Sequence, residues 1–268
     1  MSMKKKQIKG KKMFVNERFN SITEYLKEHK RASVTELSNV LYVSPATVRR
    51  DLLEMQKMGL VARTHGGALY LDNSDEVSIF VRLEKDSLEK ELTASVALDR
   101  IPPFQTVFID NSSTCLALAE RMDLSHKTIV TNGLQIASKL SSKHDVNIIM
   151  PGGELHYNTN AVTGSLACNQ LRSFKFDLSL CSCAAIDADS SYEFSLETIQ
   201  IKKVAMEQSK LHVLVVSESK FTRTAPYVTC GLSAYHAIMT NAPDEVVEPL
   251  RESGLRVYNK PSKKHAKQ

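Results

Sequence analysis

The sequence predicts an α/β protein of two domains: three short helices with a β-hairpin, then a larger domain built on a mostly parallel sheet. Residues 14–71 contain several helix N-cap residues, each followed by apolar residues at helical spacing, and apolar strands alternate with helical patterns from residue 85 onward. At 268 residues the chain is too long for the first domain alone. The expected parts are a disordered basic tail at 1–13, the first domain at 14–71, a linker at 72–84, the second domain at 85–258 and a basic tail at 259–268.

Two helical patterns open the first domain. Apolar residues at helical spacing predict a helix over residues 16–29. Ser33 and Glu36 have the spacing of a capping box, in which each side chain accepts a bond from the other residue's backbone N–H, so a second helix should begin there. Residues 42–43 should form the turn to a third helix.

The third helix carries the more informative residues. Ser44 is a good N-cap, and Pro45 stands at the first helical position, where its missing N–H costs nothing. The apolar face is expected to consist of Val48, Leu52, Leu53 and the run Met55–Met58. That face turns Thr47, Arg49 and Arg50 toward solvent at the end of the helix that helix-turn-helix proteins insert into the major groove of DNA.

A β-hairpin is predicted directly after this helix. Residues 60–63 form one expected strand, Gly66 and Gly67 the turn, and residues 68–71 the returning strand. Three helices followed by such a hairpin make a winged helix. The helices alone would leave DNA binding open, because adjacent arginines are often only a solvated face and capped helices occur in any small helical domain.

The order of residues in this segment makes the prediction of DNA binding more specific. Between Thr47 and Ala68 the chain reads Thr-Val-Arg-Arg-Asp-Leu, then Gly-Leu, a basic residue and His-Gly-Gly-Ala, and so resembles the N-terminal domain of DeoR-type bacterial transcriptional regulators. The resemblance implies binding to double-stranded operator DNA. The expected contact residues are Ser44, Pro45, Ala46, Thr47, Arg49, Arg50, Arg63, His65, Gly66 and Gly67. Which arginine faces a base edge and which a phosphate stays open.

Charge is divided unevenly between the two domains. Residues 1–70 hold 14 Lys and Arg against 6 Asp and Glu, while the remainder holds 21 against 24. This asymmetry fits a nucleic-acid partner for the first domain only. The lysine-rich start of the chain either adds phosphate attraction or merely solubilises. Because no apolar run follows these lysines and no stretch is long enough to cross a bilayer, we expect a cytoplasmic protein without a membrane partner.

The five cysteines show no metal-type Cys-x-x-Cys spacing. Cys181 and Cys183 would share one face of a strand, which is too little to predict zinc or a redox switch. We therefore expect reduced, mostly buried thiols, and no metal, cofactor or catalytic residue.

Polar loops follow three successive strands predicted in the second domain. They are Asp110–Thr114, Thr131–Gly133 and Pro151–Gly153. Each is also ordinary cap or turn chemistry, but the carboxyl ends of parallel strands meet at one edge, so their recurrence favours a ligand site there. The helix that starts after Asp110 could receive a phosphate at its positive end.

Residues 85–221 again resemble the DeoR family, in its C-terminal sensor domain. That domain is related to ribose-5-phosphate isomerase and glucosamine-6-phosphate deaminase folds and generally senses a phosphorylated sugar. The resemblance, with the loops, gives the expected effector residues: Asp110, Ser112, Ser113, Thr114, Thr131, Asn132, Gly152, Gly153, Asp187, Glu197 and Lys220.

The chain departs from the family pattern at several of these loops. Ser112, Ser182, Ala185 and Ser191 stand where the family usually has glycine, and Ser217 where it has aspartate. A Cβ at such positions could narrow the pocket.

Three functions follow from these patterns. The first is a repressor of sugar uptake or catabolism genes, controlled by a phosphorylated sugar. The second is an effector-blind regulator whose second domain only assembles the protein. The third is a sugar-phosphate isomerase or deaminase, which would need Asp110, Asp187, Glu197 and Lys220 to converge. The family and the usual palindromic operators imply a homodimer or homotetramer.

Overall fold

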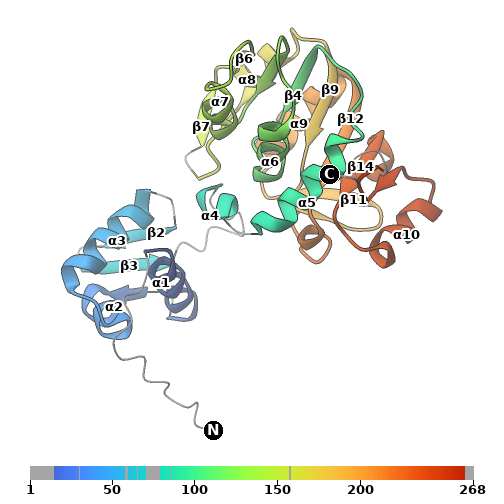
Figure 1. The fold of residues 1–268 in the computed structure, drawn as a ribbon. Coiled ribbons are helices and arrows are strands. Elements are labelled where there is room, and N and C mark those ends of the chain that lie inside the picture. Colours follow the sequence, from blue (N-terminus) through green and yellow to red (C-terminus); the bar gives the residue numbers. More distant parts are fainter. Residues whose placement is uncertain are drawn as a thin grey trace. The chain divides into compact units, whose positions relative to one another are not determined.

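The computed structural model describes residues 15–29, 31–57, 60–64, 66–70, 79–84, 86–156 and 158–262. The chain divides into two compact units, residues 1–73 and 74–268 (Figure 1). The tail predicted over residues 1–13, together with Met58 and His65, lies outside the described residues.

The N-terminal unit contains the three predicted helices and a three-stranded antiparallel sheet of order β1-β3-β2. Its elements are α1 (Val15–His29), β1 (Arg31–Ser33), α2 (Val34–Leu41), α3 (Pro45–Lys57), β2 (Val61–Thr64) and β3 (Gly67–Tyr70). The sequence did not predict β1, which pairs with β3 through only three residues.

Local capping explains where these helices begin. The Ser33 side chain accepts from the Glu36 N–H at 3.1 Å, and the Glu36 carboxylate accepts from the Ser33 N–H at 2.7 Å, which confirms the capping box. Ser44 accepts from the Thr47 N–H at 3.1 Å and so caps α3. Tyr42 ends α2 in the left-handed conformation, with φ of 54°.

The core of this unit is formed by side chains from all three helices. Ile22, Leu26, Leu37, Val48 and Met55 are fully buried within it. Leu53 was predicted to join this face, but it is exposed. The buried stripe of α3 is therefore narrower than the sequence suggested, because positions three and four apart already fill the contact with α1 and α2.

The wing departs slightly from its predicted turn. Thr64 pairs with Gly67, so Gly67 belongs to β3 and not to the turn. A Cβ on Gly67 would stand 2.0 Å from the Ala32 carbonyl oxygen. This glycine is therefore required because β1 approaches the wing closely.

The second unit is built on a seven-stranded sheet of order β15-β14-β12-β9-β4-β5-β6, with every neighbouring pair parallel. The strands are β4 (Thr106–Ile109), β5 (Thr128–Thr131), β6 (Asn147–Ile149), β9 (Phe176–Cys181), β12 (Ser209–Val216), β14 (Ala237–Thr240) and β15 (Val257–Tyr258). This confirms the predicted parallel α/β architecture.

Helices cover both faces of this sheet (Figure 1). Val107 and Ile109 pack against α5 (Ser87–Leu98), α6 (Ser113–Arg121) and α7 (Leu134–Leu140). Phe108 points to the opposite face, which is covered by α8 (Ser165–Leu171), α9 (Leu196–Glu207) and α10 (Asp244–Glu252). The alternation along β4 explains why its residues are apolar without a break.

Smaller antiparallel elements were not predicted. One is the hairpin of β7 (Glu154–His156) and β8 (Ala161–Thr163), and the other a sheet of β10 (Ala185–Ile186), β11 (Ser190–Glu193) and β13 (Tyr227–Gly231). Short 3-10 turns occur at η1 (Glu218–Lys220) and η2 (Leu232–Ala234).

Two expected boundaries differ from the structure. Residues 79–84, expected within a linker, form helix α4 of the second unit (Ile79–Glu84); the Ile79 side chain is buried, and the Ile79 N–H donates to the Asn158 carbonyl at 3.0 Å. Residues 259–262 were expected in the basic tail, but Lys260 pairs with Asp244 and the Ser262 N–H donates to Asp99 at 3.0 Å. Each segment is held by partners distant in sequence, which no local pattern reveals.

Candidate functional site

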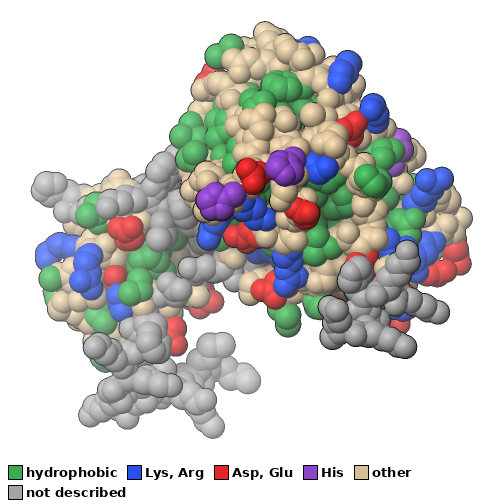
Figure 2. Space-filling model, turned by 45° about the horizontal axis from the view of Figure 1, so that its top comes forward, with side chains coloured by type: hydrophobic (Ala, Val, Ile, Leu, Met, Phe, Trp, Pro, Cys, Tyr) green, Lys and Arg blue, Asp and Glu red, His purple; other side chains and the backbone are tan. Residues whose placement is uncertain are grey.

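The exposed start of α3 is the candidate nucleic-acid surface of the first unit. Arg49 and Arg50 are exposed, as predicted, and Figure 2 shows Lys and Arg side chains at the surface of this unit. Ser44, Pro45 and Ala46 are exposed beside them, and Thr47 is half-buried. In the wing Gly66 is exposed and Gly67 is buried, while His65 and the side chain of Arg63 lie outside the described residues.

A buried ion pair fixes α3 against α1. Arg18 contacts Asp51 through two bonds, Nε to Oδ2 at 2.6 Å and Nη2 to Oδ1 at 2.9 Å. The hydrogen bond to Asp51 is the largest cause of the raised pKa of Arg18. Asp51, which belongs to the quoted Thr-Val-Arg-Arg-Asp-Leu segment, therefore positions the helix that presents Arg49 and Arg50.

In the second unit Asp110 lies at the carboxyl end of β4 and is buried. Its Oδ1 accepts from the Ser112 N–H at 3.1 Å and its Oδ2 from the Ser182 N–H at 2.9 Å. The Lys202 ammonium of α9 stands 3.0 Å from the same Oδ2. Asp110 therefore joins the ends of β4 and β9 to α9.

Asp110, Lys202 and Glu193 together form what we call the ion cluster. Lys202 also donates to Glu193 and, at 2.6 Å, to the Ser182 carbonyl. Burial is the largest influence and by itself would raise the pKa of Asp110, but the charge of Lys202 and the hydrogen bonds from Ser112 and Ser182 together hold that pKa below its usual value. Burial likewise opposes the charge of Lys202, yet the two carboxylates raise its pKa well above normal. The sequence patterns indicated neither Lys202 nor Glu193.

The loops after β4 and β5 pack directly against each other. A Cβ on Gly133 would stand 2.8 Å from the Asn111 Cα, so the close approach requires glycine. Ser112 caps α6 by accepting from the Cys115 N–H at 3.1 Å, and the neighbouring Ser113 and Thr114 are buried. The structure thus brings the first two predicted loops together.

Two predicted residues of the β5 loop are buried at the same edge. Thr131 Oγ1 accepts from the Gly133 N–H at 3.0 Å. Asn132 is 1% exposed; its Nδ2 donates to the Val162 carbonyl at 3.3 Å, while its Oδ1 has no hydrogen-bond partner among the described residues. Asn132 therefore keeps one free acceptor.

Four of the remaining predicted effector residues are exposed and are not shown to lie beside the loops after β4 and β5. Gly152 and Gly153 are exposed, and the Gly152 N–H donates to Gln170 at 2.7 Å. Asp187 is exposed in the β10–β11 turn, where the Tyr192 hydroxyl lowers its pKa by hydrogen bonding. Glu197 is exposed in the first turn of α9.

Lys220 lies in η1, just beyond the carboxyl end of β12, and is partly buried. Burial lowers its pKa to about 8, assisted by the positive charges of Arg223 and Arg82. No described residue forms a hydrogen bond or ion pair with its ammonium. Among the described residues, Lys220 is thus a cation without a direct ion-pair partner.

The residues that replace family glycines are accommodated by specific contacts. Ser182 donates its N–H to Asp110, and Ser191 Oγ lies 2.9 Å from the Tyr235 hydroxyl. Ala185 is buried in β10, and Ser217, at the position expected to hold aspartate, is buried as well. These side chains fill space within the fold.

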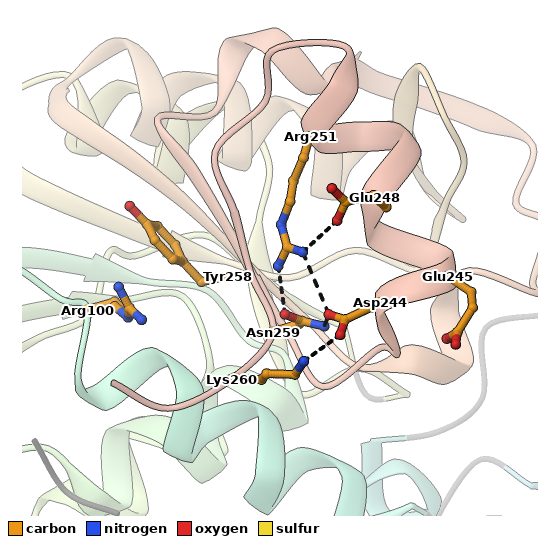
Figure 3. A pocket seen from close by; sticks show the side chains of 8 residues that line it. All are labelled: Arg100, Asp244, Glu245, Glu248, Arg251, Tyr258, Asn259 and Lys260. Atoms are coloured by element: carbon orange, nitrogen blue, oxygen red, sulfur yellow. Dashed lines mark hydrogen bonds and ion pairs between the residues drawn. The ribbon is translucent and has the colours of Figure 1, made fainter. Parts of the chain in front are cut away.

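A surface pocket of about 580 Å³ lies elsewhere, where α10 meets β15 (Figure 3). Its charges bind one another: Arg251 contacts Asp244 and Glu248, and Lys260 contacts Asp244. Arg100 lies 4.5 Å from the centre of the Tyr258 ring. The lining of this pocket includes none of the predicted effector residues.

Other kinds of site find little support in the described part of the chain. All five cysteines are free thiols, four of them buried, and β9 ends at Cys181, so Cys183 lies beyond the strand. His, Cys, Asp and Glu side chains nowhere gather there in threes as a metal would require. Among the same residues, no helix combines the length and apolar character needed to span a membrane.

The two units define the class of protein: a winged-helix DNA-binding module followed by a parallel α/β domain. Residues 18–74 match the model of the DeoR-like helix-turn-helix domain, and residues 85–242 match the DeoR C terminal sensor domain. The chain therefore belongs to the DeoR family of transcriptional regulators.

Curated relatives match nearly the whole chain. The glycerol-3-phosphate regulon repressor of Escherichia coli K12 is 35% identical, covering 86% of this chain and 92% of the relative. The HTH-type transcriptional repressor GlcR of Bacillus subtilis 168 is 27% identical, covering 85% and 89%. Among solved structures, ribose 5-phosphate isomerase A from Neisseria gonorrhoeae gives a TM-score of 0.36 with 13% identity, covering 50% of this chain and 52% of that chain, a likeness that says nothing about function.

Proposed function

We propose that this chain is a sequence-specific repressor of sugar uptake or catabolism genes, released from its operator by a phosphorylated sugar. The exposed Arg49 and Arg50, held in place by the buried Arg18–Asp51 pair, support the DNA-binding half of the proposal. The names of the glycerol-3-phosphate regulon repressor and GlcR give further support. Operators of this kind are commonly palindromic, so we propose a homo-oligomer.

The effector half rests on the carboxyl edge of the sheet. The loops that follow β4 and β5 pack together there, and neither Asn132 Oδ1 nor the Lys220 ammonium has a hydrogen-bond partner in the part of the chain that the structure describes. Buried polar groups normally have hydrogen-bond partners. Unsatisfied groups at this edge therefore favour a domain that binds a polar ligand over one that only assembles the protein. The enzyme alternative has less support, since Asp110 is neutralised in the ion cluster while Asp187 and Glu197 are exposed.

The proposal is tested with Arg49→Ala, Arg50→Ala and the double variant. Operator DNA is first selected from a random pool with the wild-type chain, and its affinity is then measured by fluorescence anisotropy at fixed salt. Each arginine that contacts a base should contribute about 1–3 kcal/mol, whereas one that contacts only phosphate should weaken binding to all sequences alike. Lys27→Ala, an exposed cation near the end of α1, is the control. A double variant that binds selected DNA like the wild type would contradict the proposal.

A further inference from the structure

Helix α4 lies at the carboxyl edge of the sheet in the second unit. Its first residue is tied to the loop before β8, because the Ile79 N–H donates to the Asn158 carbonyl. Near its other end, the Arg82 carbonyl accepts a hydrogen bond from the Lys90 ammonium. Between these ties α4, which Figure 1 labels, contacts α6. The Leu83 side chain packs on the core cluster of the second unit. The helix is therefore fixed near the start of α6, where the predicted effector loops converge.

Arg82 of this helix holds a charge that the described protein does not neutralise. Its Nε and Nη2 atoms are buried and have no hydrogen-bond partner among the described residues. Buried N–H groups without an acceptor are costly, because they have lost their water without gaining a replacement. A planar guanidinium is also the side chain best suited to bind a phosphate through two parallel bonds.

The turn that carries Lys220 is fastened beside α4. The Ser219 N–H lies 3.4 Å from Glu89 of α5, and the Glu218 N–H donates to Asn241 at 2.8 Å. Arg223, just beyond the turn, contacts Asp86 at 3.3 Å between α4 and α5. The turn is thus anchored to the α4–α5 corner by contacts that leave the Lys220 ammonium free.

Arg82 and Lys220 lie on neighbouring segments, because Arg223, three residues after Lys220, contacts Asp86, four residues after Arg82. The positive charge of Arg82 contributes to the lowered pKa of Lys220, after burial and Arg223. We call Arg82 and Lys220 the cation pair. Arg223 and Lys90 add positive charge nearby, but Asp86 partly neutralises Arg223 and the Arg82 carbonyl engages Lys90. Two like charges without an acceptor among the described residues, at the edge of the second unit, indicate a position for a divalent anion.

We propose that the cation pair, the Arg82 guanidinium and the Lys220 ammonium, binds the phosphate group of the effector beneath α4. This assignment rests on the proposed function and makes it more specific. The sugar part would then extend toward the β5 loop, where Asn132 Oδ1 can accept from a hydroxyl. Asp110 keeps a structural role, because its oxygens are occupied by Lys202, Ser112 and Ser182.

The assignment gives α4 a part in regulation. This helix is the first element of the second unit in the described sequence, and it follows the boundary between the units at residues 73 and 74. A ligand changes DNA affinity only if it favours one conformation over another. A phosphate held by Arg82 favours conformations in which α4 stays at the sheet edge, and so acts on the element closest in sequence to the DNA-binding unit.

The test uses the full chain and a panel of glycerol 3-phosphate, glucose 6-phosphate and fructose 6-phosphate. The unphosphorylated compounds at matched ionic strength serve as the blank. Fluorescence anisotropy reports release of selected operator DNA, and isothermal titration calorimetry gives the affinity of whichever compound acts. Arg82→Met and Lys220→Gln should each weaken that affinity on the order of ten- to a hundredfold while leaving DNA affinity without ligand unchanged.

Matched controls separate the site from general charge effects. Arg121→Met removes an arginine of α6 whose guanidinium already binds the Glu91 carbonyl and Ser95, and Lys210→Gln removes an exposed lysine paired with Asp177. Both should respond to the effector like the wild type, whereas Arg82→Lys should respond only partly because lysine cannot form the two parallel bonds. An Arg82→Met protein that responds like the wild type overturns the assignment alone. A wild-type protein indifferent to the whole panel contradicts the effector half of the proposed function, and the assignment with it.

Discussion

Two groups of buried charge in the second unit differ in how they are satisfied. In the ion cluster, Lys202 contacts both Asp110 and Glu193, and all three side chains are almost fully buried. In the cation pair, Nε and Nη2 of Arg82 and the Lys220 ammonium have no hydrogen-bond acceptor among the described residues. A charge satisfied by the protein stabilises its fold, while one left without a partner is available to a ligand. We therefore expect the same carboxyl edge of the sheet to serve both structure and binding.

The largest expected effect breaks the ion cluster. Lys202→Met leaves two buried carboxylates without their cation and should destabilise the second unit by about 3–5 kcal/mol. The thermal unfolding midpoint should fall on the order of 10 °C. Lys203→Met removes an exposed neighbour and is the control. If the two variants unfolded at the same temperature, the ion cluster would have no structural role.

A milder substitution in the ion cluster tests whether charge balance holds it together. Glu193→Gln keeps an oxygen acceptor for Lys202 and removes one of the two negative charges, so Asp110 still balances the lysine. We expect a loss of about 1 kcal/mol, measured as a shift of the urea midpoint. A loss as large as that of Lys202→Met would show that charge balance is not what holds the cluster together.

The cation pair should respond to pH through Lys220. The folded-state pKa, about 8, lies below the usual value of 10.5, so the unfolded chain binds this proton more tightly. Stability should therefore rise as the pH increases between about 8 and 10.5, and Lys220→Met should abolish that rise. Binding of a phosphate should weaken over the start of this range, as the ammonium is lost. Unfolding midpoints of wild type and variant at pH 7, 8 and 9 measure the difference; parallel curves would contradict it.

Local signals were sufficient for much of the architecture. Ser33 with Glu36 and Ser44 with Pro45 mark helix starts that the structure reproduces, since a cap is satisfied by atoms within three residues. The apolar strands that alternate with helical patterns after residue 85 predicted the parallel sheet for a similar reason. A strand buried on both faces, such as β4, is apolar along its whole length. The short strands β1 and β10 leave no such pattern, because only two or three residues pair in each.

The candidate site was harder to predict, because its important partners are far apart in sequence. Asp110 was foreseen as an effector residue, yet its partner Lys202 comes from a helix more than ninety residues later. Arg82 was placed in a linker, since six helical residues carry too little periodicity to be recognised. Lys220 was predicted from the resemblance, and only its surroundings in the fold show that it lacks a counter-ion.

The central claim is that Arg82 is kept for a ligand and not for the fold, and the unfolding temperature of Arg82→Met without any phosphate tests it most directly. Replacing a partly buried cation, whose Nε and Nη2 have no partner among the described residues, by a side chain of similar length should leave the midpoint unchanged or raise it by a few degrees. Arg121→Met, which breaks existing hydrogen bonds, should lower it slightly. A clear fall of the Arg82→Met midpoint, below that of Arg121→Met in chloride buffer, would show that Arg82 supports the fold and would contradict the account.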